Sequence, residues 1–224
     1  MTTPRRDFLS WLGATSTFAA AGLPVLPTHH ATPIDSLVPI SDKWDMTWCD
    51  RVTGKVRAVF DSPHLDEGSG MFRAQLWRDQ HIEVYGAPLG DISAVLVIRH
   101  EAIPLVMNDT YWQRFDLGKE LKLKDQNDKK WTKVNPVGVL QPGTPEKYTK
   151  YNIAEFIKSG GIVLACNLAF GEIVAKFMKE DKLSKDDARK RAIEHLIPGV
   201  ILQPSGGFAV LRAQQAGCHY LFAS

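Results

Sequence analysis

The sequence predicts an α/β fold, in which helices cover both faces of a mainly parallel five-stranded sheet. Five short apolar segments begin near residues 55, 93, 161, 199 and 218, and helical patterns separate most of them. Strands that alternate with helices form βαβ units, whose strands run parallel. The chain has 224 residues and a hydrophobic content of 44%, which is enough to bury the core of one domain of ordinary size.

The first half of the domain is predicted to contain two strands and three helices. Residues 55–61 alternate between polar and apolar side chains, as a half-buried strand does. Residues 70–86 place large apolar side chains near helical spacing. Residues 93–100 form a nearly continuous apolar run, which is typical of a strand covered on both faces. Residues 105–121 then indicate a helix and a shorter second one.

The second half repeats the alternation after a polar insertion. Residues 117–145 include a polar stretch with Pro and Gly near its end, which predicts an inserted surface loop. Ser184 and Asp187 form an opening that resembles a capping box. The remaining predicted elements are helix 151–161, strand 162–166, helices 168–180 and 184–196, strand 199–203, helix 208–217 and strand 218–223.

The N-terminal segment has the plan of a secretory signal, with a basic start, an apolar middle and a stretch of small residues. The pair Arg5-Arg6, followed after one residue by Phe8-Leu9, resembles a twin-arginine export signal. The run of alanines over residues 19–21 offers a cleavage site. The alternative interpretation is an ordinary amphipathic N-terminus.

These features divide the chain into three parts. We expect a signal peptide over residues 1–21, an irregular Pro-containing arm over 22–50, and the α/β domain over 51–224 with its insertion at about 117–145. Twin-arginine export implies the export machinery as a partner and a periplasmic or other extracytoplasmic location. The apolar part of the leader is too short and too interrupted for a stable membrane span.

Charge and cysteine spacing exclude several classes of function. Lys and Arg total 27 against 25 for Asp and Glu, so the net charge of +2 predicts no nucleic-acid partner. Cys49, Cys166 and Cys218 form no CxxC, haem-attachment or zinc-binding spacing, and we assign neither a metal nor a cofactor. An oxidising compartment could join Cys49 to one of the other two, whereas Cys218 in the final strand is expected to serve packing.

Three segments, taken in order, carry a resemblance to a known family. They are AVLVIRHEAIPLVM (94–107), EFIKSGGIVLACNLAF (155–170) and LIPGVILQPSGGFAVLRAQQAGCHYL (196–221). Together they resemble the DsrE/DsrF-like sulfur-relay superfamily, in which a strand ending in Ala-Cys, a PGV strand and a PSG ending recur. The chain departs from this pattern at Arg99-His100-Glu101, where many members have His-Gly, and in its long insertion.

The resemblance implies a flavodoxin-like three-layer sandwich that forms homotrimers or homohexamers. In such proteins a cysteine near the end of a central strand carries sulfur as a persulfide and passes it to a thiol of another protein. Cys166 is the residue that matches this position. If the chain is an enzyme, the resemblance implies a sulfurtransferase-like activity.

The position of Cys166 along the chain also makes it a candidate for a reactive thiol. It ends a predicted strand immediately before a helix, where free N–H groups favour a thiolate. Asn167 could donate a hydrogen bond or cap the helix, and His100, at the end of its own strand, could act as proton donor or thiolate partner. The alternatives are a buried, inert Cys166 and a structural His100.

Four further residues are candidates for ligand binding. Arg99 and Glu101 add charge at the same predicted edge, and Ser205-Gly206 form a loop at a helix start that suits an anion. Capping, packing and turn formation are the alternative roles of these residues. The leading hypothesis is therefore sulfur or thiol-dependent ligand handling at Cys166. The alternative is a non-catalytic oligomeric module that binds a small molecule or metal.

Overall fold

A computed structural model describes residues 43–125 and 129–224. The predicted signal peptide and residues 22–42 of the predicted arm lie outside the described residues. Within the described ranges, no helix combines the length and the apolar character needed to cross a membrane.

The described chain contains a five-stranded sheet in which every pairing is parallel, so the predicted α/β class is confirmed. The strands run in the order β4-β3-β2-β1-β5, which differs from the 2-1-3-4-5 order of flavodoxin itself. Their bounds are β1 Val56–Ser62, β2 Ile92–Ile98, β3 Ile162–Cys166, β4 Ile201–Gln203 and β5 His219–Phe222.

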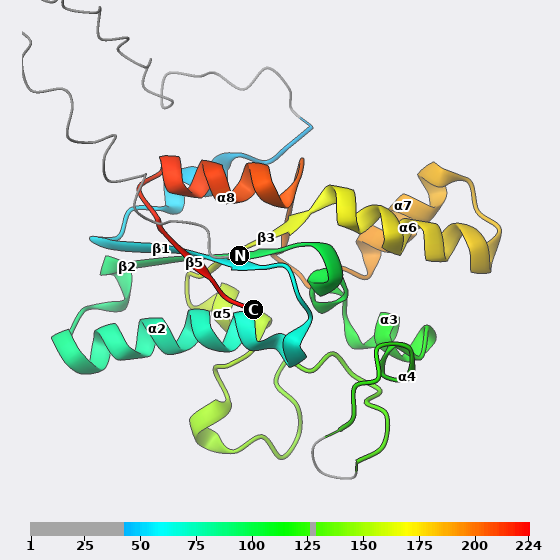
Figure 1. Cartoon of the computed structure of the whole chain (residues 1–224), viewed down its shortest axis with the longest axis horizontal. Coiled ribbons are helices and arrows are strands. Elements are labelled where there is room, and N and C mark those ends of the chain that lie inside the picture. The colour runs from blue at the N-terminus through cyan, green and yellow to red at the C-terminus, as the bar shows by residue number, and fades with distance from the viewer. Residues whose placement is uncertain (1–42, 126–128) are drawn as a thin grey trace, which may run out of the picture. The chain divides into compact units, whose positions relative to one another are not determined.

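Helices cover both faces of this sheet and complete three layers (Figure 1). The helices α2 (Ser69–Tyr85) and α5 (Ile153–Lys158) pack on one face. On the other face lie α8 (Gly206–Gln215) and the short 3-10 helix η2 (Thr47–Arg51). All seven residues of β2 are buried, because this central strand has neighbours on every side.

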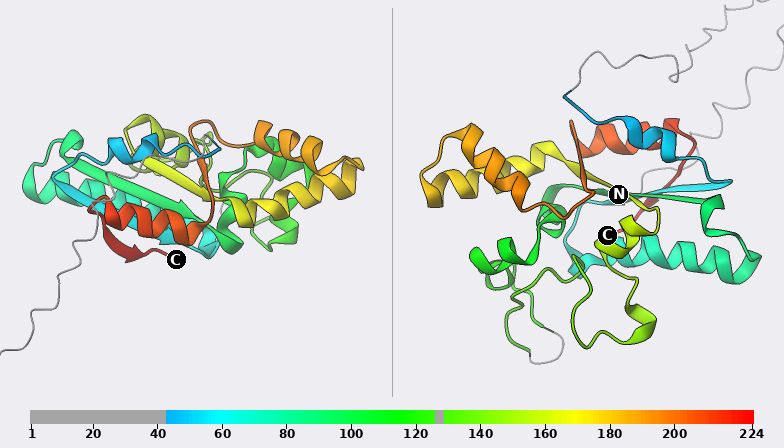
Figure 2. Two further views of the ribbon diagram at one scale, coloured as in Figure 1. Left: turned by 90° about the horizontal axis from the view of Figure 1, so that it is seen from above. Right: turned by 180° about the vertical axis from the view of Figure 1, so that it is seen from behind.

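Other helices extend beyond the carboxyl ends of the strands (Figure 2). They include α6 (Asn167–Asp181), which packs along α7 (Lys185–Glu194). The connection after β2 supplies the remainder of this region, namely η5 (His100–Val106), α3 (Asp109–Arg114) and α4 (Leu117–Glu120). Three single-turn 3-10 helices complete the described elements: η3 Asp66–Gly68, η4 Leu89–Asp91 and η6 Glu146–Tyr148.

Two differences from the sequence predictions have clear physical reasons. The helical region after β2 starts as a 3-10 turn, and Pro104, which lacks an N–H group, lies inside it. The packed domain also begins before residue 51, because Trp48 in η2 is fully buried against the face that carries α8.

The predicted cap at Ser184 is confirmed, since its Oγ accepts the Asp187 N–H at 3.2 Å.

The predicted surface insertion is anchored to the core through Asn135. This side chain is fully buried, and its Nδ2 donates to the carbonyl oxygens of Leu105 and Met107, both at 2.7 Å. Its Oδ1 accepts the Val137 N–H at 3.0 Å. One amide therefore satisfies three buried backbone groups that would otherwise lack partners.

Replacement of Asn135 by Ala should lower the free energy of unfolding by about 3 kcal/mol, since it strands buried polar groups. Urea denaturation followed by circular dichroism measures the change. The exposed Glu146→Ala variant is the control and should change stability by less than about 0.5 kcal/mol. Equal effects in the two variants would contradict the anchoring role of Asn135.

Candidate functional site

Cys166 is the last residue of β3 and the N-cap of α6. Its Sγ accepts the Ala169 N–H at 3.5 Å, so the sulfur occupies the place that a hydroxyl or carboxylate oxygen takes in an ordinary cap. The thiol is 4% exposed. The sulfur therefore lies at the N-terminus of a 15-residue helix, where the helix dipole has its positive end.

Arg99 lies beside Cys166 at the end of the neighbouring strand. Ile98 pairs with Ala165 across β2 and β3, so the next residues along, Arg99 and Cys166, are adjacent at the carboxyl edge. The pKa of Arg99 is raised mainly by its hydrogen bond with Asp61, and the charge of Cys166 makes the last and smallest contribution among the causes of this shift. Arg99 thus brings a positive charge to the part of the carboxyl edge where Cys166 lies.

The main partner of Arg99 is Asp61 at the end of β1. Arg99 Nε donates to Oδ1 at 2.7 Å and Nη2 donates to Oδ2 at 2.9 Å, in a two-pronged pair. Tyr220 of β5 donates its hydroxyl to the same Oδ2 at 3.0 Å. The hydrogen bond with Asp61 is the largest cause of the raised Arg99 pKa, while burial is the largest cause of the raised pKa of Tyr220.

Gly206 allows Arg99 to take this position. A Cβ at Gly206 would lie 2.4 Å from Cδ and 2.6 Å from Cβ of Arg99, which is closer than such atoms can approach. The Arg99 stem therefore crosses the first residue of α8. Ser205 acts as the cap of that helix, because its Oγ accepts the Phe208 N–H at 3.1 Å.

The other predicted site residues lie in different surroundings. His100 is exposed with a positive φ of 48°, and within the described ranges it makes no hydrogen bond to Cys166. Glu101 is exposed and its Oε2 lies 3.3 Å from His64 Nδ1. Asn167 follows Cys166 directly, and its buried Oδ1 has no partner among the described residues. The geometry thus assembles Cys166, Arg99 and Gly206, while His100 and Glu101 face solvent.

Sequence reasoning missed Asp61 and Tyr220. Asp61 is 3% exposed, although it ends an alternating strand where an acid would ordinarily meet solvent. Its position directly after three consecutive apolar residues of β1 was the available signal. The sequence gives no such signal for Tyr220, because its hydrogen bond to Asp61 depends on β5 lying next to β1.

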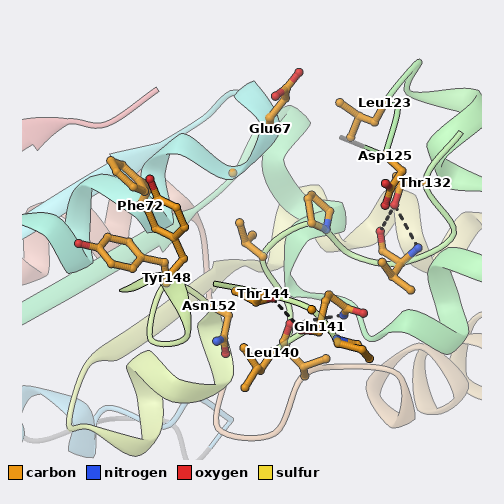
Figure 3. A pocket seen from close by; sticks show the side chains of 18 of the residues that line it. Glu67, Phe72, Leu123, Asp125, Thr132, Leu140, Gln141, Thr144, Tyr148 and Asn152 are labelled. Carbon is orange, nitrogen blue, oxygen red and sulfur yellow. Dashed lines mark hydrogen bonds between the residues drawn. The ribbon is translucent and has the colours of Figure 1, made fainter. Parts of the chain in front are cut away.

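A separate cavity of about 520 Å³ opens between the start of α2 and the insertion (Figure 3). Phe72 and Tyr148 form one wall, and Leu123, Asp125 and Thr132 lie opposite them (Figure 3). The Phe72 ring stacks on Tyr151 with centroids 4.9 Å apart. Prolines 136, 142 and 145 also line this cavity, whose wall combines apolar side chains with polar ones such as Gln141 and Asn152.

No family model matches the sequence, and no curated protein matches it. Among the described residues, no group of three or more His, Cys, Asp or Glu side chains is arranged to hold a metal ion.

The Asp61→Asn variant should lose about 2 kcal/mol of unfolding free energy, because it breaks a largely buried charge pair whose Arg99 partner keeps some access to water. Tyr220→Phe removes one hydrogen bond from the same carboxylate and should cost about 1 kcal/mol. Urea denaturation of both variants shows which substitution lowers the free energy of unfolding more. A smaller loss in Asp61→Asn than in Tyr220→Phe would contradict the central place of the Asp61–Arg99 pair.

Proposed function

We propose that this protein is an exported DsrE-like sulfur carrier in which Cys166 holds a sulfane sulfur as a persulfide. The observation that supports this most directly is the position of the thiol, which caps α6 and lies beside Arg99 at the carboxyl edge of the sheet. Ligand sites of open parallel sheets lie at this edge. The resemblance of residues 155–170 and 196–221 to the sulfur-relay superfamily supplies the type of reaction.

The chemistry requires a thiolate and no redox partner. The Cys166 thiolate attacks the outer sulfur of a donor persulfide, so that a new S–S bond forms at Cys166 and the donor leaves as a thiolate. A thiol of a second protein then attacks the outer sulfur, and Cys166 leaves as a thiolate. The α6 N-terminus and Arg99 stabilise the Cys166 thiolate that starts the first step and leaves in the second.

Burial of Cys166 determines which donors can react. At 4% exposure the sulfur admits a small donor or the end of a flexible chain, whereas a bulky reagent is excluded. A persulfide adds one sulfur to the side chain, which moves the reacting atom outward. The proposed acceptor is a thiol on a partner protein that docks over this edge.

Self-association is part of the same proposal. The edge strand β5 exposes Tyr220, Leu221 and Phe222, and α8 exposes Phe208 and Leu211. Large apolar side chains of this kind are commonly covered in an oligomer. We expect a homotrimer or homohexamer, located in the periplasm or another extracytoplasmic space after twin-arginine export.

Incubation with a small persulfide donor should add one sulfur atom to the intact protein, on Cys166. Arg99→Met should slow the loading about tenfold, equal to about 1.4 kcal/mol of activation free energy, because the neighbouring positive charge is lost. Intact-mass spectrometry with peptide mapping follows the reaction over time.

Cys218→Ser is the matched control for this experiment and should load as the original chain does, whereas Cys166→Ser should not load. Native protein that gains no sulfur, or equal labelling of Cys166→Ser, would contradict the sulfur-carrier proposal.

The second candidate function is binding of a small molecule without thiol chemistry, which the cavity beside Phe72 and Tyr148 favours. Its volume of about 520 Å³ falls in the range of small-molecule sites. An organic ligand with both apolar and polar groups suits the rings, prolines and polar side chains that line it.

If this candidate holds, an organic ligand should copurify with the protein in amounts that Cys166→Ser leaves unchanged. Phe72→Ala, which removes part of one wall, should weaken binding about five- to thirtyfold and lower that amount accordingly, since the ring supplies about 1–2 kcal/mol of contact energy. Native mass spectrometry measures ligand occupancy. Loss of the ligand in Cys166→Ser with retention in Phe72→Ala would refute the second candidate.

A further inference from the structure

Cys49 and Cys218 lie on the α8 face of the sheet and pack against the same buried cluster, away from the sulfur proposed to react. Cys218 is 5% exposed and belongs to the buried cluster beneath α8, and Cys49 packs against that same cluster. Cys49 lies in η2, which covers the same face of the sheet as α8 and lies towards the C-terminal end of α8 in the front view (Figure 1) and the view from behind (Figure 2, right). Cys218 immediately precedes β5, and β5 follows that end of the helix.

Arg57 ties the two chain segments together. Its Nε donates to the Gly54 carbonyl at 2.6 Å, and its Nη1 donates to the Ala216 carbonyl at 3.0 Å. Gly54 follows Cys49 by five residues, and Ala216 precedes Cys218 by two. The Arg57 side chain therefore connects the segment after η2 to the turn before β5.

The two thiols also interact electrostatically. Burial raises the pKa of the Cys218 thiol to about 11, the nearby Arg57 guanidinium opposes this shift, and the Cys49 thiol adds to it. This influence is consistent with the packing of both cysteines against one buried cluster on the α8 face. Cys166 is not among the groups that affect Cys218.

We propose that Cys49 and Cys218 form a disulfide in an oxidising compartment, and that this bond fastens η2 to the start of the edge strand β5. The bond would leave Cys166 as the thiol available for sulfur chemistry. The proposal goes beyond the sulfur-carrier function and does not depend on any reaction of Cys166.

A disulfide donor, such as a thiol-disulfide oxidoreductase or oxidised glutathione, supplies the oxidising equivalents. The half-buried Cys49 reacts first, and its thiolate attacks the donor disulfide and releases one donor thiolate. The Cys218 thiolate then attacks the Cys49 sulfur in the mixed disulfide and releases the second donor thiol. Two cysteine thiols are oxidised, one donor disulfide is reduced to two thiols, and the cysteine protons pass to the departing thiolates.

The test is a thiol count on the full chain. Reduced protein is incubated with oxidised glutathione, denatured, and labelled with N-ethylmaleimide for mass spectrometry. The expected product carries one label, on Cys166, and yields a peptide pair joined through Cys49 and Cys218. Its melting temperature should be several degrees above that of the reduced protein, because the bond closes a long loop.

Three variants separate this proposal from the sulfur-carrier function. Cys166→Ser should still form the Cys49–Cys218 link while losing sulfur loading. Cys49→Ser and Cys218→Ser should each lose the link and the gain in melting temperature. Three labels on oxidised wild-type protein, or a link that contains Cys166, would overturn the disulfide proposal and leave the sulfur-carrier proposal to its own test.

Discussion

A buried carboxylate at the end of the first strand organises the carboxyl edge of this sheet. Asp61 is almost fully removed from water, so its charge requires compensation within the protein. Arg99 supplies the opposite charge through two hydrogen bonds, and Tyr220 adds a third. One carboxylate thereby connects the ends of β1, β2 and β5.

The strand order places the Asp61–Arg99 pair next to Cys166. Because β2 lies between β1 and β3, Arg99 can bind Asp61 on one side and lie next to Cys166 on the other. Gly206 lets the same side chain cross the start of α8. The environment of the candidate thiol thus depends on a charge pair, on the absence of one Cβ and on the N-terminus of α6.

Local patterns in the sequence were sufficient to predict the strands, most helices and the junction at Cys166. Residues 162–166 are apolar and are followed by a helical pattern, so the strand and the helix could be located without knowledge of their neighbours. The contacts of Asp61, Trp48 and Asn135 could not be predicted in this way, because each partner lies far away in sequence. His100 was predicted near Cys166 from its position after β2, whereas the backbone at this residue takes a positive φ and the side chain faces solvent. Its role in catalysis stays a prediction.

The central claim is that Cys166 is a reactive thiol despite its burial, and its alkylation rate in the folded protein tests this most directly. Fully reduced native protein is treated with iodoacetamide, and peptide mass spectrometry compares Cys166 with Cys218, which is similarly buried. The account predicts faster modification of Cys166 than of Cys218, with about a tenfold slower rate at Cys166 in Arg99→Met. Modification of Cys166 that is no faster than that of Cys218, or that occurs only after unfolding, would contradict it.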